Sequence, residues 1–112
     1  MEVTTHVFGE AVILSIDGDM DAATSPLLAQ KVNALLAEGK AKLVVDLSNV
    51  PFMDSSGLAT LVLVHKRTKS ARGEIRVCGL QEPVQELFDM TQIDRMLAVF
   101  PDAVTASAGW AN

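Results

Sequence analysis

The stretch LVVDLSNVPFMDSSGLATLVLV, residues 43–64, is the part of the sequence that decides the fold. It opens with a short apolar, β-branched run over residues 43–47, which suits a central strand covered on at least one face. A loop that contains Pro51 follows. Asp54-Ser55-Ser56-Gly57 then stands before a second apolar run over residues 58–64, which indicates a helix. A strand followed by a helix in this way is the building unit of an α/β protein.

The neighbouring segments continue this alternation of strands and helices. Residues 3–8 and 11–16 predict two strands joined by a tight turn at Gly9-Glu10, which suggests a hairpin. A helix is expected to start at Ser25, whose side chain can cap it, with Pro26 in the first helical position. The later elements are a strand over residues 74–78, a short helix opening at Pro83 and a last strand within residues 96–100. This order implies right-handed crossovers and a mixed, partly parallel sheet.

The composition limits the class of the protein. With 112 residues, of which 49% are hydrophobic, the chain matches one ordinary domain, which we expect to span residues 1–112 with a loosely ordered tail at about residues 104–112. The net charge of −5 argues against direct binding to nucleic acid, which needs a concentrated basic face. No signal peptide and no run of about 18 apolar residues is visible, so we expect a cytoplasmic protein that does not enter a membrane.

Few side chains are available for thiol or metal chemistry. Cys78 is the only cysteine, which excludes an internal disulfide, and its apolar neighbours predict a buried, inert thiol. Asp19 and Asp21 stand two positions apart beside Asp17. They suggest a solvated acidic loop or a loop that docks a partner, because a magnesium site needs a phosphate or further carboxylates. We therefore expect no metal site and no cofactor.

Two hypotheses explain the hydroxyl groups at the start of the predicted helix. The first is a helix cap, in which Asp54 or Ser55 accepts hydrogen bonds from the unpaired N–H groups of the first turn and contributes about 1 kcal/mol. The second is a phosphorylation site. A phosphate on Ser55 adds a charge of about −1.5 to −2, which the free N–H groups and the helix dipole are expected to accommodate. A partner docked against Ser55 would then meet a bulky anion, while Gly57 would give that partner close access to the backbone.

Catalysis by either serine is not expected. A serine nucleophile needs a general base within hydrogen-bond reach. His65 lies further along the same predicted helix, roughly 15 Å from Ser55 at 1.5 Å per residue, and His6 lies in the first predicted strand. We therefore predict that the protein is not an enzyme.

Residues 52–58, Phe52-Met53-Asp54-Ser55-Ser56-Gly57-Leu58, resemble the signature of STAS-domain anti-sigma factor antagonists of the SpoIIAA/RsbV type. Three further segments resemble the same family: Gly18-Asp19-Met20-Asp21, Val44-Val45-Asp46-Leu47 and Leu87-Phe88-Asp89-Met90-Thr91. The order and spacing of the segments make the resemblance specific, and it covers about residues 3–101. It implies the SpoIIAA-like STAS fold, an α/β fold with a mixed sheet of four to five strands and helices packed mainly on one face.

The resemblance implies a phosphorylation-controlled partner switch. Family members of this type, when unphosphorylated, bind an anti-sigma factor that is also a serine kinase, which frees the sigma factor and so regulates transcription. The kinase phosphorylates the serine directly after the aspartate, here Ser55, and a PP2C-type phosphatase restores the unmodified form. The partner-binding positions that the resemblance implies are Asp19, Asp21, Asp54 and Ser56. We also expect Gly57 to take part through its accessible backbone, and Met53 beside the site is either a core residue or a partner contact. The free protein is expected to be a monomer.

The chain departs from the family pattern at Asp19, where glutamate is usual, and at Ala59, where a glycine often stands. Both departures bear on which kinase the protein recognises. An alternative function is that of a STAS regulatory subunit of a membrane transporter, such as an ABC-type lipid transporter, with Ser55 as a binding hydroxyl. A third is a sensor of a small molecule or nucleotide at the same helix start.

Overall fold

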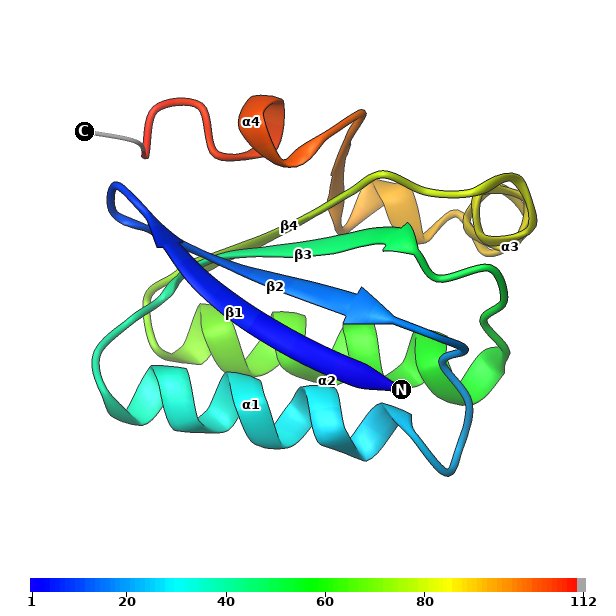
Figure 1. Ribbon diagram of the computed structural model, residues 1–112, viewed down its shortest axis with the longest axis horizontal. Coiled ribbons are helices and arrows are strands. Elements are labelled where there is room, and N and C mark those ends of the chain that lie inside the picture. Colours follow the sequence, from blue (N-terminus) through cyan, green and yellow to red (C-terminus); the bar gives the residue numbers. More distant parts are fainter. Residues whose placement is uncertain (111–112) are drawn as a thin grey trace.

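The computed structural model describes residues 1–110 and arranges them around one five-stranded sheet (Figure 1). The first two strands, β1 (Glu2–Phe8) and β2 (Ala11–Asp17), pair antiparallel along their whole length. Gly9 turns the chain between them with a φ of 62°, a backbone conformation that glycine adopts without a side-chain clash. The predicted hairpin is confirmed.

The other three strands join β2 in parallel, in the spatial order β1-β2-β3-β4-β5. They are β3 (Lys42–Asn49), β4 (Glu74–Cys78) and β5 (Ala98–Phe100). The crossovers contain α1 (Ser25–Ala37), α2 (Ser55–Ser70) and α3 (Glu82–Thr91), the last followed by a 3-10 turn, η1 (Ile93–Arg95). The mixed sheet with alternating strands and helices confirms the α/β fold that the sequence predicts.

The main core lies between the sheet and the two long helices. Side chains of a strand alternate between the faces of a sheet, and Leu14, Val45 and Val77 point to the face that α1 and α2 cover (Figure 1). The helices contribute Leu28, Val32, Leu61, Val64, Val84 and Phe88 to the same cluster. Phe88 is the one aromatic residue among these, in line with an aromatic content of 4%. The start of α2 is therefore anchored in a closely packed layer.

Residues 101–110 cover the other face of the sheet (Figure 1). They include a single-turn helix, α4 (Ala103–Ala106), and they bring Ala106 and Trp110 into one apolar cluster with Ile13 and Val44. Trp110 is only 7% exposed. The chain is therefore folded onto the sheet as far as Trp110, in contrast to the loose tail expected from about residue 104, because the apolar second face needs a cover. Residues 111–112 of the expected tail lie outside the described residues.

Helix α1 begins at Ser25, but Ser25 does not cap it. Its side chain is 1% exposed, and its hydroxyl has no hydrogen-bond partner among the described residues. Instead, Oδ1 of Asp21 accepts hydrogen bonds from the N–H groups of Ala23 (3.0 Å) and Thr24 (3.1 Å). The predicted cap is wrong, because a carboxylate four residues earlier satisfies the donors of the turn that leads into the helix.

Helix α2 has 16 residues and carries the site described below at its amino end. Its last turn contains Arg67 and Lys69, where cations interact favourably with the helix dipole. No helix within residues 1–110 combines the length and the apolar character needed to cross a membrane.

Candidate functional site

The amino terminus of α2 lies at the edge of the sheet where the parallel strands end, beside the loop that joins β2 to α1 (Figure 1). In open α/β sheets this edge commonly carries the ligand site. Asp54 is the N-cap residue, and its Oδ1 accepts hydrogen bonds from the N–H groups of Ser56 (2.9 Å) and Gly57 (3.2 Å). The cap hypothesis is therefore confirmed, with Asp54 as the capping side chain.

The two serines that follow the cap differ in accessibility. Ser55 is the first residue of α2 and is exposed, whereas Ser56 is half-buried. The carbonyl oxygen of Ser56 also accepts a hydrogen bond from the Thr60 hydroxyl (3.1 Å), one turn further on. An approaching molecule can reach the side chain of Ser55 more readily than that of Ser56.

The cap changes what a phosphate on Ser55 would meet. The sequence predicts free N–H groups at this helix end, but the carboxylate of Asp54 already binds those of Ser56 and Gly57. A phosphate would therefore add its charge of about −1.5 to −2 next to an engaged carboxylate. Like charges in proximity repel, so the surface would become more negative instead of being neutralised by the helix end.

Two loops form this site, and Met20 joins their backbones. The N–H of Met20 donates to the carbonyl oxygen of Phe52 (3.0 Å), and the carbonyl oxygen of Met20 accepts from the N–H of Asp54 (3.2 Å). Gly57 lies so close that a Cβ atom on it would stand 2.7 Å from the Met20 carbonyl oxygen. The acidic loop of residues 19–21 and the start of α2 are therefore held together as one unit.

The structure divides the predicted partner-binding residues between the surface and the core. Asp19 is exposed, and Asp21, Asp54 and Ser56 are partly exposed. Met53 is only 5% exposed and Gly57 is buried. Met53 therefore lies beneath the surface, and the backbone of Gly57 is covered by Met20 and Met53 in place of being accessible as expected.

Phe52 is a surface residue that the sequence analysis does not assign to the site. Its side chain is 50% exposed, although Met53 beside it belongs to the core. Consecutive residues of an extended segment point to opposite sides, so a buried Met53 implies an outward Phe52. An exposed aromatic ring three positions before Ser55 offers apolar contact area to a partner.

Acidic side chains dominate this edge of the molecule. Hydrogen bonds from the side chain and the backbone of Thr24 hold the pKa of Asp21 below its usual value, so Asp21 is ionised at neutral pH. The ion pairs within residues 1–110 lie elsewhere: Lys40 with Glu38, Lys42 with Glu10 and Arg76 with Glu74. Among the described residues, neither Asp19 nor Asp54 takes part in an ion pair.

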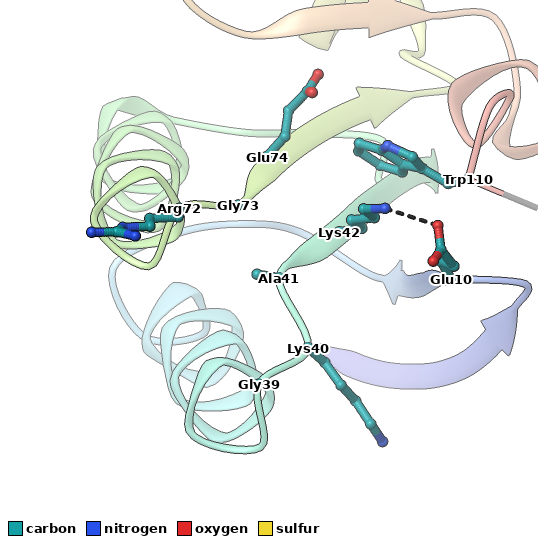
Figure 2. A pocket seen from close by; sticks show the side chains of 9 residues that line it. All are labelled: Glu10, Gly39, Lys40, Ala41, Lys42, Arg72, Gly73, Glu74 and Trp110. Atoms are coloured by element: carbon teal, nitrogen blue, oxygen red, sulfur yellow. Dashed lines mark hydrogen bonds and ion pairs between the residues drawn. The ribbon is translucent and has the colours of Figure 1, made fainter.

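A cavity of about 470 Å³ lies at the opposite edge of the sheet, where β3 and β4 begin. It is lined by Glu10, Gly39, Lys40, Ala41, Lys42, Arg72, Gly73, Glu74 and Trp110. Figure 2 shows the side chains of Lys40 and Arg72 directed away from it, while Lys42 is bound to Glu10 (2.8 Å). Because its cations are turned outward or paired, this cavity does not favour an anionic ligand.

Within residues 1–110, no three histidine, cysteine or carboxylate side chains come close enough to hold a metal ion. His65 is half-buried further along α2, and burial together with Lys69 and Lys66 lowers its pKa. Cys78 is buried as predicted, and burial together with the nearby Asp46 raises the pKa of its thiol to about 12.

The fold and the site together define a small α/β domain with an exposed serine at a capped helix start. The model of the STAS domain family matches residues 2–106, and the chain belongs to that family. It is 31% identical over 86 residues to an anti-sigma-B factor antagonist of Bacillus subtilis, a match that covers 77% of this chain and 78% of the relative. It is 28% identical over 96 residues to an anti-sigma F factor antagonist of Paenibacillus polymyxa, covering 85% and 82% of the two chains.

Solved structures show the same fold. A putative anti-sigma factor antagonist from Thermotoga maritima superimposes with a TM-score of 0.90, covering 98% of this chain and 95% of that one at 22% identity. The murine solute carrier 26 family member A9 anion transporter matches with a TM-score of 0.77 at 21% identity, over 95% of this chain but 18% of the transporter. At these identities the likeness establishes only the fold, and the function has to be argued from the site.

Proposed function

We propose that this protein is an anti-sigma factor antagonist that works as a phosphorylation-controlled partner switch. In its unphosphorylated form it binds an anti-sigma factor that is also a serine kinase, and the sigma factor is released to direct transcription. Phosphorylation of Ser55 ends that binding, and a PP2C-type phosphatase restores it. The names of the sequence relatives support this role.

The observation that carries the proposal is the exposed Ser55 hydroxyl at the rigid, capped start of α2. Asp54 fixes the first turn through two backbone amides, so a kinase and a binding partner meet the same fixed geometry. The acidic loop at Asp19 and Asp21 is held against this turn through Met20. The proposed docking surface therefore comprises Ser55, the exposed edges of both loops and the ring of Phe52.

Electrostatics and size explain how a phosphate would act as a switch. A partner that accommodates Ser55 closely has to admit three additional oxygen atoms and a charge of about −1.5 to −2. A hundredfold loss of affinity requires about 2.7 kcal/mol, and like-charge contacts or a buried, unpaired anion cost that much at an interface. Because Asp54 already occupies the nearby amides, the phosphate would remain largely uncompensated. Release of the partner then needs no change in the fold.

The test is to map the phosphate after incubation with ATP and a purified anti-sigma factor kinase that binds the protein. Mass spectrometry is expected to place the phosphate on Ser55, and Ser55→Ala is expected to remove it. Ser56→Ala is the matched control, because it deletes the adjacent hydroxyl and should still be phosphorylated. Phosphate on another residue, with Ser55 unmodified, would refute the assignment of the site.

A further inference from the structure

The two faces of the sheet are covered in different ways. One face carries the long helices α1 and α2, whereas in the described part of the chain the other face carries residues 101–110 with the single turn of α4 (Figure 1). A helix of one turn has no appreciable stability in isolation, because nucleation costs more than one hydrogen bond returns. Residues 101–110 therefore stay in place through their contacts with the sheet.

Arg76 on β4 makes several of these contacts with one side chain. Its Nη1 donates hydrogen bonds to the carbonyl oxygens of Ala106 (2.8 Å) and Ala108 (3.3 Å). Its Cζ lies 3.7 Å from the centroid of the Trp110 ring, a cation–π distance. Its Nε is 2.8 Å from Oε2 of Glu74, which orients the guanidinium group. Arg76 thus holds α4, the residues after it and Trp110 in place at once.

A second connection lies at the end of the segment. The N–H of Glu10 donates to the carbonyl oxygen of Trp110, at 2.6 Å, and links the segment to the β1–β2 turn. Trp110 also lines the cavity shown in Figure 2, so one side of the ring borders open space. Beneath the segment lie four residues that are at most 5% exposed: Ala11, Ile13, Val44 and Cys78.

We propose that residues 101–110 form a strap that opens as a unit while the rest of the domain stays folded, and that Arg76 controls how often it opens. Local openings of this kind need less free energy than global unfolding, and the regular structure within residues 101–110 is limited to the single turn of α4. Opening uncovers an apolar patch that includes Ile13, Val44 and Cys78. This patch lies on the opposite face of the sheet from α2, so the opening of the strap is separate from the site at Ser55. The proposal does not depend on the proposed partner switch.

The chain carries its own reporters of this motion. Cys78 is its only cysteine and Trp110 its only tryptophan, and both belong to the cluster that the strap closes. The closed strap keeps the thiol buried and protonated, so N-ethylmaleimide reacts with Cys78 only when the strap or the whole domain opens. The two kinds of opening differ in urea dependence, because the slope with urea scales with the surface that is exposed.

The experiment measures the rate of Cys78 labelling by N-ethylmaleimide in the full chain at low urea, beside global unfolding followed by circular dichroism. We expect the labelling of the wild type to depend less on urea than global unfolding does. Arg76→Gln is expected to raise the labelling rate about tenfold or more, because it removes the cation–π contact and a charged hydrogen-bond donor. Arg67→Gln is the matched control: Arg67 is exposed and donates only to Asn33 on α1, so its loss should leave the rate unchanged.

If Arg76→Gln does not fold, Trp110→Phe tests the same strap, because it keeps an aromatic ring but weakens the contact with Arg76. Increased quenching of Trp110 fluorescence by acrylamide in Arg76→Gln, with unchanged helical circular dichroism, would be a second expected result. Labelling that follows global unfolding with the same urea slope in every variant would overturn the strap. If the labelling rate depended only weakly on urea but was equal in Arg76→Gln and Arg67→Gln, the role of Arg76 would be overturned.

Discussion

The carbonyl oxygen of Met20 lies against the α-carbon of Gly57, so closely that a Cβ atom on Gly57 would stand 2.7 Å from it. The same Cβ would stand 2.7 Å from Cγ of Met53. Through these contacts the acidic loop packs directly on the first turn of α2, which sets the distance between the loop and Ser55. A glycine in a helix is unfavourable by about 1 kcal/mol relative to alanine, and here the close approach of two loops requires it.

Replacing Gly57 by alanine is therefore expected to destabilise the domain. The new methyl group must displace the Met20 backbone or the Met53 side chain, and overpacking of this kind costs about 1–3 kcal/mol. Urea unfolding followed by circular dichroism measures the change in the free energy of unfolding. The loop that carries Asp19 should also move relative to Ser55, so binding to the partner should weaken more than stability alone requires.

Ala59→Gly supplies the control for helix propensity. Ala59 is exposed on α2, two residues beyond Gly57, and its substitution should cost about 1 kcal/mol without any clash. If propensity governed position 57 as well, Gly57→Ala would stabilise the protein by a similar amount. A stabilised Gly57→Ala variant would show that the contact with Met20 is not tight.

Asp54 is expected to act through its hydrogen bonds in the free protein and through its charge in the phosphorylated one. Asp54→Ala removes the acceptor for the N–H groups of Ser56 and Gly57 and should cost about 1 kcal/mol of unfolding free energy. Asp54→Asn keeps a capping oxygen without the charge and should cost little. Urea unfolding of both variants checks this. Equal losses in the two variants would assign the effect to charge and not to capping.

The order of elements and the place of the site follow from local sequence signals. Hydrophobic periodicity and helix capping depend on neighbouring residues in the sequence, so they can be recognised without the fold. The strand at residues 43–47, the cap at Asp54 and the apolar start of α2 are all indicated in this way. Asp54 is an example: an acid directly before a helical run is a cap in most contexts, and it is a cap here. The class of fold and the exposed serine could therefore be predicted.

Features set by tertiary contacts could not be predicted in the same way. Met53 is buried through its pairing with Met20, which lies 33 positions earlier, and nothing within residues 52–58 indicates that partner. Ser25 stands before Pro26 as a capping residue would, but the side chain of Asp21 accepts the hydrogen bonds from the N–H groups of the turn that leads into α1. Trp110 is buried because it packs against Arg76 and the face of the sheet opposite α1 and α2. The sequence around it consists mainly of small residues and shows no hydrophobic periodicity that would indicate this contact.

His65 is expected to make the stability of the protein fall as the pH drops below its ordinary pKa of about 6.5. Burial, with Lys69 and Lys66 nearby, lowers its pKa in the folded protein, so the unfolded chain binds a proton at a higher pH than the folded one. The contribution of neutral His65 is complete above its unfolded pKa of about 6.5 and is lost as the pH falls towards the folded pKa. Urea unfolding at about pH 7.5 and about pH 5.5 should show lower stability at the lower pH.

The matched variant for this effect is His65→Gln, which should show a smaller difference between the two pH values than the wild type. Asp21 and Asp102, whose pKa values are also lowered, do not interfere, because they lose their charge below a pH of about 4. An unchanged pH difference in His65→Gln would assign the dependence to other groups.

Substitutions of Ser55 test the switch itself. Ser55→Ala changes an exposed side chain, so its unfolding free energy should stay within about 0.5 kcal/mol of the wild type. It should bind the anti-sigma factor kinase whether or not ATP is present, because no phosphate can be added. Ser55→Asp places a carboxylate beside that of Asp54 and should bind at least about tenfold more weakly, a loss of about 1.4 kcal/mol, as measured by titration calorimetry.

Ser70→Asp is the matched charge control for that measurement. Ser70 is exposed and ends the same helix, so the variant adds the same charge at the far end of α2 from the proposed docking surface. It should bind as the wild type does, apart from a small unfavourable interaction of the new charge with the helix dipole. If Ser55→Asp and Ser70→Asp weakened binding equally, the effect would follow net charge, and Ser55 would not be the point at which a phosphate expels the partner.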